Sequence, residues 1–319
     1  MQTKLNIFGV KVLINSDTDI ANWLEHDYGY YSSFYADKPT LVFNLVPNLP
    51  DYNKLPALKA SKYHDDYIVY ESKSLRLIDY FGQALVIYRI KNKVIDVYSA
   101  SKDGLYDVFY CAFETLVGEE LDNLGFHRIH CLGIERKGKA ALLLLPPGAG
   151  KSTLAFKFLE NKNFKVLSED IVLFKKGMLY GLHFRWGTRD LSKKGRLMKR
   201  DKYFDKVLVS AKGLDLAVKA RPCEIILGRR VLSSNSRLFK IGKFGMFMPL
   251  FKSMVLGLEL QQSLAYFLLR NYKEGFSKAS IGFSRFFAML SVLYRSKTYS
   301  FEMGSSIEKN YSFLDYFLK

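Results

Sequence analysis

The sequence is poor in cysteine and has no long uninterrupted apolar run. Its three cysteines, Cys111, Cys131 and Cys223, lie far apart and form no C-x-x-C pair, which argues against a disulfide framework or a zinc cluster. The longest apolar stretch, residues 244–269, is interrupted by Lys252 and Glu259 and falls short of the ~18 apolar residues of a spanning helix. No basic segment followed by an apolar run opens the chain, so no signal peptide is expected. We therefore expect a cytoplasmic protein that contacts a membrane at most peripherally.

Acidic residues are scarce in the C-terminal part of the chain. Residues 1–183 carry 22 Lys and Arg against 21 Asp and Glu, whereas residues 184–319 carry 26 against 10. A basic surface attracts nucleotide phosphates, acidic proteins, nucleic acid or anionic lipid, and it also aids solubility with no partner at all. No zinc-finger spacing, aromatic RNA-recognition motif or helix-turn-helix pattern is present, so nucleic acid is not the expected partner.

Internal repeats and low-complexity tracts are also missing, which argues against a solenoid or a disordered tail. A chain of 319 residues is long enough for two domains. The first 100 residues contain short runs rich in Val, Ile, Tyr and Phe with turn residues between them, and one helix is expected near residues 19–28, with Asp19 as its N-cap. A helical pattern begins at Leu105. We therefore predict a β-rich N-terminal domain over residues 1–104 and a second domain over residues 105–319.

The second domain is predicted to combine α-helices with a mixed sheet that they flank. After its first helix come two strands over residues 127–145, a glycine-containing loop, a helix from Lys151 and an extended segment to Phe174. Strand, glycine loop, helix and strand is the order of a phosphate-binding unit. Further along, we expect a strand over residues 223–232 and helices over residues 247–272 and 279–291. The following segment, residues 293–303, is expected to end in a strand.

The sequence LLLLPPGAGKSTL, residues 142–154, contains the elements of a phosphate-binding loop. Gly148, Ala149 and Gly150 are small enough for backbone N–H groups to turn towards an anion, and the following helix directs its positive end at the same place. Lys151 can neutralise phosphate charge, Ser152 can bind Mg²⁺, and Thr153 adds a second hydroxyl. Leu145 occupies the position of the first glycine in the usual pattern, where the strand passes into the loop. Pro146 and Pro147 stiffen the backbone at this junction.

An acidic pair and a histidine complete the set of candidate site residues. Glu169 and Asp170 follow an apolar strand, 18 and 19 residues after Lys151, where one carboxylate can hold Mg²⁺ and the other can accept a proton. The alternative for this pair is a solvated turn. His130 lies in the strand before the loop, where a lone histidine is more often a core residue than a site residue.

The segment from Ile129 to Phe174 resembles the catalytic core of the HPr kinase/phosphorylase family, whose fold is shared with ATP-dependent phosphoenolpyruvate carboxykinases. The resemblance rests on His130, the G-A-G-K-S run of residues 148–152 and the acidic pair Glu169-Asp170. It implies that Asp170 is the general base, that Glu169 or Ser152 or both serve Mg²⁺, and that His130 lies near the transferred phosphate.

The chain also departs from the family pattern. Leu145 and Pro147 replace a glycine and a Ser or Thr of the loop, Glu169 replaces the first aspartate of the pair, and Thr153 replaces a glutamate. The HPr protein is therefore not the expected substrate, and the relatives found in peptide-modification or polysaccharide gene clusters are the better comparison.

The expected function is an ATP- and Mg²⁺-dependent kinase that phosphorylates a hydroxyl of a peptide or protein serine or of a small molecule such as a sugar. Arg185 is a candidate contact to the transferred phosphate, with a solvated basic loop as the alternative. A second hypothesis is a nucleotide-responsive binding module that presents its basic C-terminal face to a partner or an anionic membrane. The acceptor and the oligomeric state stay open.

Overall fold

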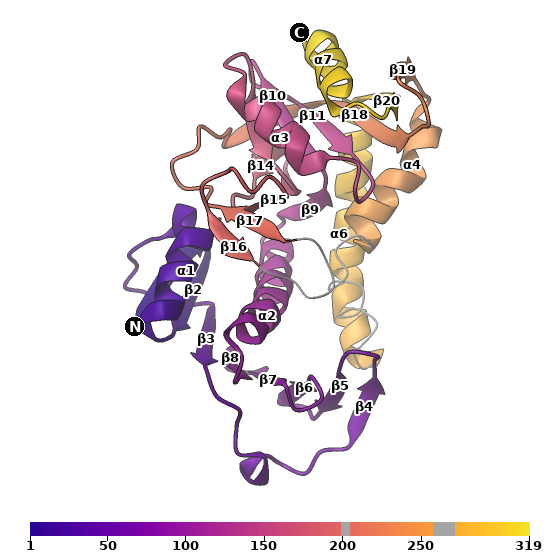
Figure 1. Cartoon of the computed structure of the whole chain (residues 1–319). Helices are drawn as coiled ribbons and strands as arrows, with labels where there is room; N and C mark the ends of the chain where they lie inside the picture. The colour runs from indigo at the N-terminus through magenta and orange to yellow at the C-terminus, as the bar shows by residue number, and fades with distance from the viewer. Residues whose placement is uncertain (199–204, 258–271) are drawn as a thin grey trace. The chain divides into compact units, whose positions relative to one another are not determined.

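The computed structural model describes residues 1–198, 205–257 and 272–319 (Figure 1). The protein is a mixed α+β chain with a β-rich N-terminal part, as predicted. It divides into two compact units, Met1–Leu121 and Asp122–Lys319. The division falls near the end of helix α2, Lys102–Asn123, whereas the sequence placed it before this helix. Asp122 belongs to the second unit because Arg285 and His127 of that unit hold its buried carboxylate.

The first unit contains an eight-stranded sheet in the order β1-β2-β3-β8-β7-β6-β5-β4. Its strands are β1 Gln2–Ile7, β2 Val10–Asn15, β3 Leu41–Val46, β4 Ala60–Tyr63, β5 Ile68–Glu71, β6 Leu75–Asp79, β7 Ala84–Arg89 and β8 Val94–Ser99. Strand β3 pairs in parallel with β2 and β8, and the other pairs are antiparallel. Strands β5 to β8 form a meander of hairpins, with turn residues between these short strands as predicted.

Two helices of the first unit contact each other through aromatic rings. They are α1, Thr18–Tyr28, and α2, and Trp23 of α1 lies against Tyr106 of α2 with 4.9 Å between ring centroids. The helix is present as expected, but the expectation that Asp19 caps it is wrong. Asp17 caps it, because the Asp17 carboxylate accepts a hydrogen bond of 2.8 Å from the Ile20 amide. Short 3₁₀ turns cover Gly29–Tyr31 and Tyr52–Lys54.

The second unit is built on a nine-stranded mixed sheet. Seven of its strands lie in the order β12-β10-β11-β18-β14-β13-β9. Strand β20 pairs with the part of β18 that follows the segment paired with β14, and β19 pairs with β20. The strands are β9 His127–His130, β10 Leu132–Arg136, β11 Lys139–Leu144, β12 Lys165–Ser168, β13 Ile171–Lys175, β14 Met178–Gly181, β18 Lys219–Arg230, β19 Arg237–Lys240 and β20 Lys297–Met303. Strands β11, β18 and β20 run parallel.

Helices pack on both faces of this sheet. On one face lie α3, Lys151–Glu160, and α7, Ile307–Leu318, which share a core with Leu143 of β11. On the other face lie α4, Lys243–Phe251, a π-helical turn η3, Lys252–Leu256, and α6, Tyr272–Arg295 (Figure 1). Alternate residues of β11 therefore enter two different cores, which explains its unbroken apolar sequence.

A small three-stranded sheet and helix α7 were not predicted. The sheet has the order β15-β17-β16, with β15 Trp186–Thr188, β16 Arg196–Met198 and β17 Lys206–Val209. The helix expected over residues 247–272 corresponds in its first part to α4 and η3, and residues 258–271 lie outside the described residues. Over the described ranges, no helix is long and apolar enough to cross a membrane.

Candidate functional site

The glycine-rich loop, residues 145–150, connects the end of β11 to the start of α3. Gly148 and Gly150 have φ values of +75° and +84°, a conformation that L-residues rarely adopt. The Ala149 amide donates a 3.1 Å hydrogen bond to the Pro146 carbonyl, which closes a tight turn. The two glycines are thus required by the backbone itself, as the sequence pattern indicated.

Leu145 occupies the place of the missing first glycine without obstructing the loop. Its side chain is buried and packs over Gly228 of the neighbouring strand β18, where an added methyl group would overlap Leu145 Cδ2. Leu144 is paired in register with Leu227, so Leu145 and Gly228 follow directly on the two strands. The sequence therefore offsets the larger residue in β11 with a glycine in β18.

Helix α3 presents an uncapped N-terminus to this loop. Gly150 is its N-cap residue, and no side chain within the described ranges hydrogen-bonds to cap the helix. The first N–H groups of a helix have no intrahelical partner, and they carry a partial positive charge. No acidic side chain lies in the first turn, and Lys151 adds a positive charge there. This end of α3 is suited to bind an anion.

Three predicted site residues meet beside the loop. Lys151 donates a hydrogen bond to Asp170, and its Nζ lies 2.7 Å from His130 Nε2. His130 Nε2 in turn lies 2.9 Å from Asp170 Oδ1. His130 and Asp170 are adjacent because β9 and β13 pair antiparallel with His130 opposite Ile171. The sequence placed His130 and Asp170 in separate strands, and only the pairing of these strands brings them together.

The charge on Asp170 is stabilised by its neighbours. Burial alone would raise the pKa of Asp170, but the hydrogen bond with His130 and the positive charge of Lys151 outweigh this effect and hold its pKa below the usual range. The Asp170 side chain is still 45% exposed, whereas those of Lys151 and His130 are 15% and 11% exposed. Asp170 is therefore an ionised carboxylate that a second molecule can reach.

Glu169 lies in a different environment from its neighbour. It accepts a hydrogen bond from Ser152 Oγ and is only 9% exposed. Burial and the negative charge of Asp170 raise the pKa of Glu169 to about 7, against the opposing effects of Ser152 and Lys151. The structure thus joins the two predicted metal ligands, Ser152 and Glu169, in one pair.

The donor set fits magnesium held together with phosphate. Within the described residues, no group of three or more His, Cys, Asp and Glu side chains is arranged to hold a metal ion by itself. Mg²⁺ commonly takes only one or two protein ligands and completes its shell with water and phosphate oxygens. Ser152 and Glu169, next to an uncapped helix N-terminus, match that requirement.

Thr153 and Arg185 are the remaining predicted residues. Thr153 is exposed in the first turn of α3. Arg185 is half-buried directly before β15, and its role stays a prediction. Arg230 was missed: its guanidinium donates a 3.1 Å hydrogen bond to the Gly148 carbonyl. Its position at the end of β18, the strand beside β11, is visible only once the strand order is known.

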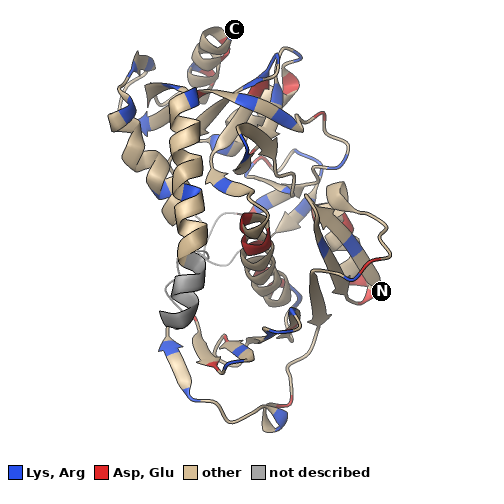
Figure 2. Cartoon of the chain, turned by 180° about the vertical axis from the view of Figure 1, so that it is seen from behind, with Lys and Arg blue, Asp and Glu red and all other residues tan. Residues whose placement is uncertain are grey.

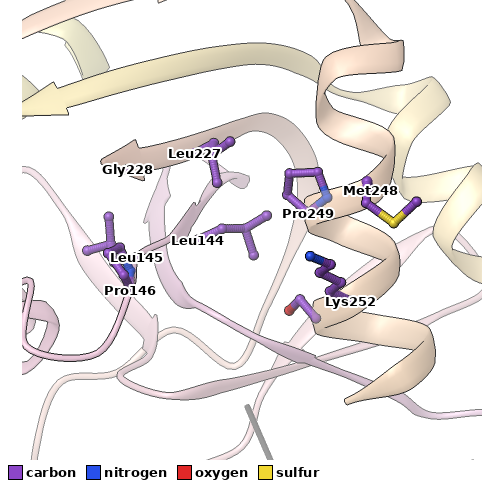
Figure 3. Close-up of a pocket in the computed structure, with 9 residues that line it drawn as sticks. Leu144, Leu145, Pro146, Leu227, Gly228, Met248, Pro249 and Lys252 are labelled. Atoms are coloured by element: carbon purple, nitrogen blue, oxygen red, sulfur yellow. The ribbon is translucent and has the colours of Figure 1, made fainter. Parts of the chain in front are cut away.

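A cavity of about 280 Å³ opens beside the start of the loop (Figure 3). Leu144 and Leu227 line it from the sheet, and Pro249 and Lys252 line it from the helical segment opposite. Ser253, which also lines it, donates a 3.1 Å hydrogen bond to the His130 carbonyl. The cavity therefore lies on the His130 side of the loop and combines an apolar wall with one cation.

Comparison with known proteins adds no family to these observations. No family model matches the chain, and a search of curated proteins found no similar sequence.

Proposed function

We propose that the protein is an ATP-dependent phosphotransferase that uses Mg²⁺ and transfers the γ-phosphoryl group to a hydroxyl. The observation that carries this proposal is the convergence of Lys151, Asp170 and His130 next to the uncapped start of α3. An anion site, an exposed carboxylate and a cation within hydrogen-bonding distance of one another are the parts that phosphoryl transfer needs. The resemblance to HPr-kinase-related proteins supports the same reaction.

In this proposal the phosphates of ATP bind to the loop and to the first turn of α3. Backbone N–H groups of residues 148–152 surround them, and Lys151 neutralises charge that develops on the γ-phosphate. Ser152 Oγ and the Glu169 carboxylate would hold Mg²⁺, which when bound neutralises the phosphate oxygens. Arg185 is a further candidate for contact with the transferred group.

The hydrogen-bonding triangle suggests how Asp170 becomes a base. His130 Nε2 carries at most one hydrogen, so it can donate to Asp170 or accept from Lys151, but not both. A phosphate group gives Lys151 a competing anionic partner. When Lys151 turns to it, the Asp170 carboxylate loses its cation and its pKa rises towards the range of an effective base.

The transfer step is then an in-line displacement. The acceptor hydroxyl gives its proton to Asp170 while its oxygen forms a bond to the γ-phosphorus. The bond between that phosphorus and the oxygen bridging to the β-phosphate breaks, and ADP leaves with the bonding electrons. The cavity on the His130 side is the proposed place for the body of the acceptor, because Ser253, one of its lining residues, is hydrogen-bonded to the backbone carbonyl of His130.

The proposal is tested with γ-labelled ATP and extracts of the cells that contain the protein, with the labelled product identified by mass spectrometry. Asp170→Asn should still bind Mg-ATP but transfer label at least ~100-fold more slowly, because the general base is lost. Asp190→Asn, which changes an exposed aspartate outside the cluster, should transfer at the wild-type rate. Transfer by Asp170→Asn at the wild-type rate would show that Asp170 is not the base. Binding of ATP without any transfer by the wild type would favour the nucleotide-responsive binding module.

A further inference from the structure

Helices α4 and α6 carry large apolar side chains that face solvent. On α6 these are Phe283 and Phe287, each 66% exposed, with Leu290 at 36% and Tyr294 at 82%. Their spacing of four, three and four residues places them on one face of the helix. On α4, Phe244 is 95% exposed and Met248 52% exposed. We call these six residues the apolar face.

The two helices pack side by side, so their exposed residues form one surface. Phe247 and Phe251 of α4 both lie against Phe286 of α6, with ring centroids 6.4 Å apart in each case. Lys243 of α4 donates a 2.6 Å hydrogen bond to the Tyr294 carbonyl, and its ammonium group lies 4.9 Å from the centroid of the Tyr294 ring. These contacts leave Phe244, Phe283 and Phe287 outside the packed interface. Exposed apolar patches of this kind mark interaction sites.

The charge around the apolar face is of one sign. No Asp or Glu occurs between residues 225 and 258, and none between residues 275 and 301, whereas these two stretches contain ten Lys and Arg residues (Figure 2). One of the ten, Arg285, is buried and paired with Asp122, so it does not contribute to the surface charge. Lys243 of α4, Lys252 of η3 and Arg295 of α6 are exposed. A partner that suits this surface must accept aromatic side chains and also carry negative charge.

We propose that the apolar face binds the surface of an anionic membrane. The polar–apolar boundary of a bilayer takes up Phe, Leu and Tyr side chains, while acidic headgroups attract the surrounding Lys and Arg. Over the described ranges, no helix can span a bilayer, so this contact is a peripheral one. The inference does not depend on phosphoryl transfer, because none of the six residues belongs to the Lys151 cluster.

Sedimentation with lipid vesicles tests this proposal. The full chain should pellet with vesicles of phosphatidylcholine and phosphatidylserine, pellet far less with phosphatidylcholine alone, and be released as salt screens the headgroup charge. The double variant Phe283→Ser/Phe287→Ser should lower the bound fraction at least ~10-fold. Lys243→Glu should weaken binding to the anionic vesicles alone. Tyr316→Ser, which changes an 83% exposed tyrosine on α7, is the matched control and should bind as the wild type does.

Each of the following results would overturn the proposal. The wild type does not pellet with anionic vesicles at low salt, or the double variant binds as well as the wild type while circular dichroism shows both to be folded. A third is that the wild type elutes as a dimer and the double variant as a monomer in size-exclusion chromatography. That result would assign the face to a second copy of the chain.

Discussion

Glu169 and Asp170 are neighbours in sequence, yet their surroundings shift their pKa values in opposite directions. Asp170 lies beside Lys151 and His130, which favour its ionised form. Glu169 is buried beside Ser152 and next to the negative charge of Asp170, which favour its protonated form. Two neighbouring carboxyl groups with separated pKa values are typical of sites in which the two groups have different roles.

The proton on Glu169 should make the stability of the ligand-free protein depend on pH. The folded protein holds this proton up to about pH 7, whereas an unfolded chain releases it near the ordinary value of 4.5. Folding therefore takes up a proton between these two values, and the free energy of unfolding falls as the pH rises through this window. Glu169→Gln has no proton to release, so its free energy of unfolding should lack this pH-dependent change of ~2–3 kcal/mol.

Urea denaturation of both proteins at pH 5 and pH 8, without Mg²⁺, measures this difference. Relative to Glu169→Gln, the wild type should be less stable at pH 8 than at pH 5. Equal pH dependence in the two proteins would mean that Glu169 has an ordinary pKa.

At the scale of secondary-structure elements, the connection from β11 to α3 depends on how the end of β11 packs against β18. Leu145 is buried over Gly228, and Met303 Sδ of β20 lies 3.2 Å from where a Gly228 side chain would begin. Gly228→Ala should therefore displace Leu145 and the loop that it anchors. The expected loss in the free energy of unfolding is ~1–3 kcal/mol, the usual effect of an overpacked core, and the affinity for Mg-ATP should fall with it.

A double variant separates this fit from a general effect of alanine. Leu145→Ala removes the side chain that Gly228→Ala would overlap, so the two changes together should destabilise the protein less than the sum of the single changes. Gly242→Ala, at a position with open space and an ordinary φ of −67°, serves as the control and should have little effect. Thermal or urea unfolding of the wild type, the two single variants and the double variant gives the coupling energy between residues 145 and 228. Additive effects would contradict the proposed contact.

The elements that the sequence predicted best are those with local signals. The apolar run of β11, the glycines of the loop and the helical pattern from Lys151 follow one another in the chain, and the structure has them at these positions. The contact between His130 and Asp170 was not predicted, because it depends on the pairing of β9 with β13. Arg230 and helix α7 escaped prediction since their positions beside the loop and α3 come from contacts between distant parts of the chain.

At the scale of the whole chain, the two units differ in net charge and in the proposed functional residues that they contain. Every residue of the proposed catalytic cluster and of the apolar face lies in Asp122–Lys319, and so does the excess of Lys and Arg. Met248 and Lys252 line the cavity beside the loop and also lie on the exposed side of the segment that carries the apolar face. An acceptor held at a membrane surface would thus reach the cavity from the side on which the protein is proposed to bind.

Isothermal titration of the protein with Mg-ATP tests the central claim most directly. The wild type should bind one nucleotide per chain, and Lys151→Ala should lower the affinity at least ~10-fold, because it removes the charge that holds the phosphates. Lys162→Ala, which changes an exposed lysine just beyond α3, should bind as the wild type does. The absence of binding to the folded wild type, or equal affinity in Lys151→Ala, would contradict the assignment of the glycine-rich loop as a nucleotide site.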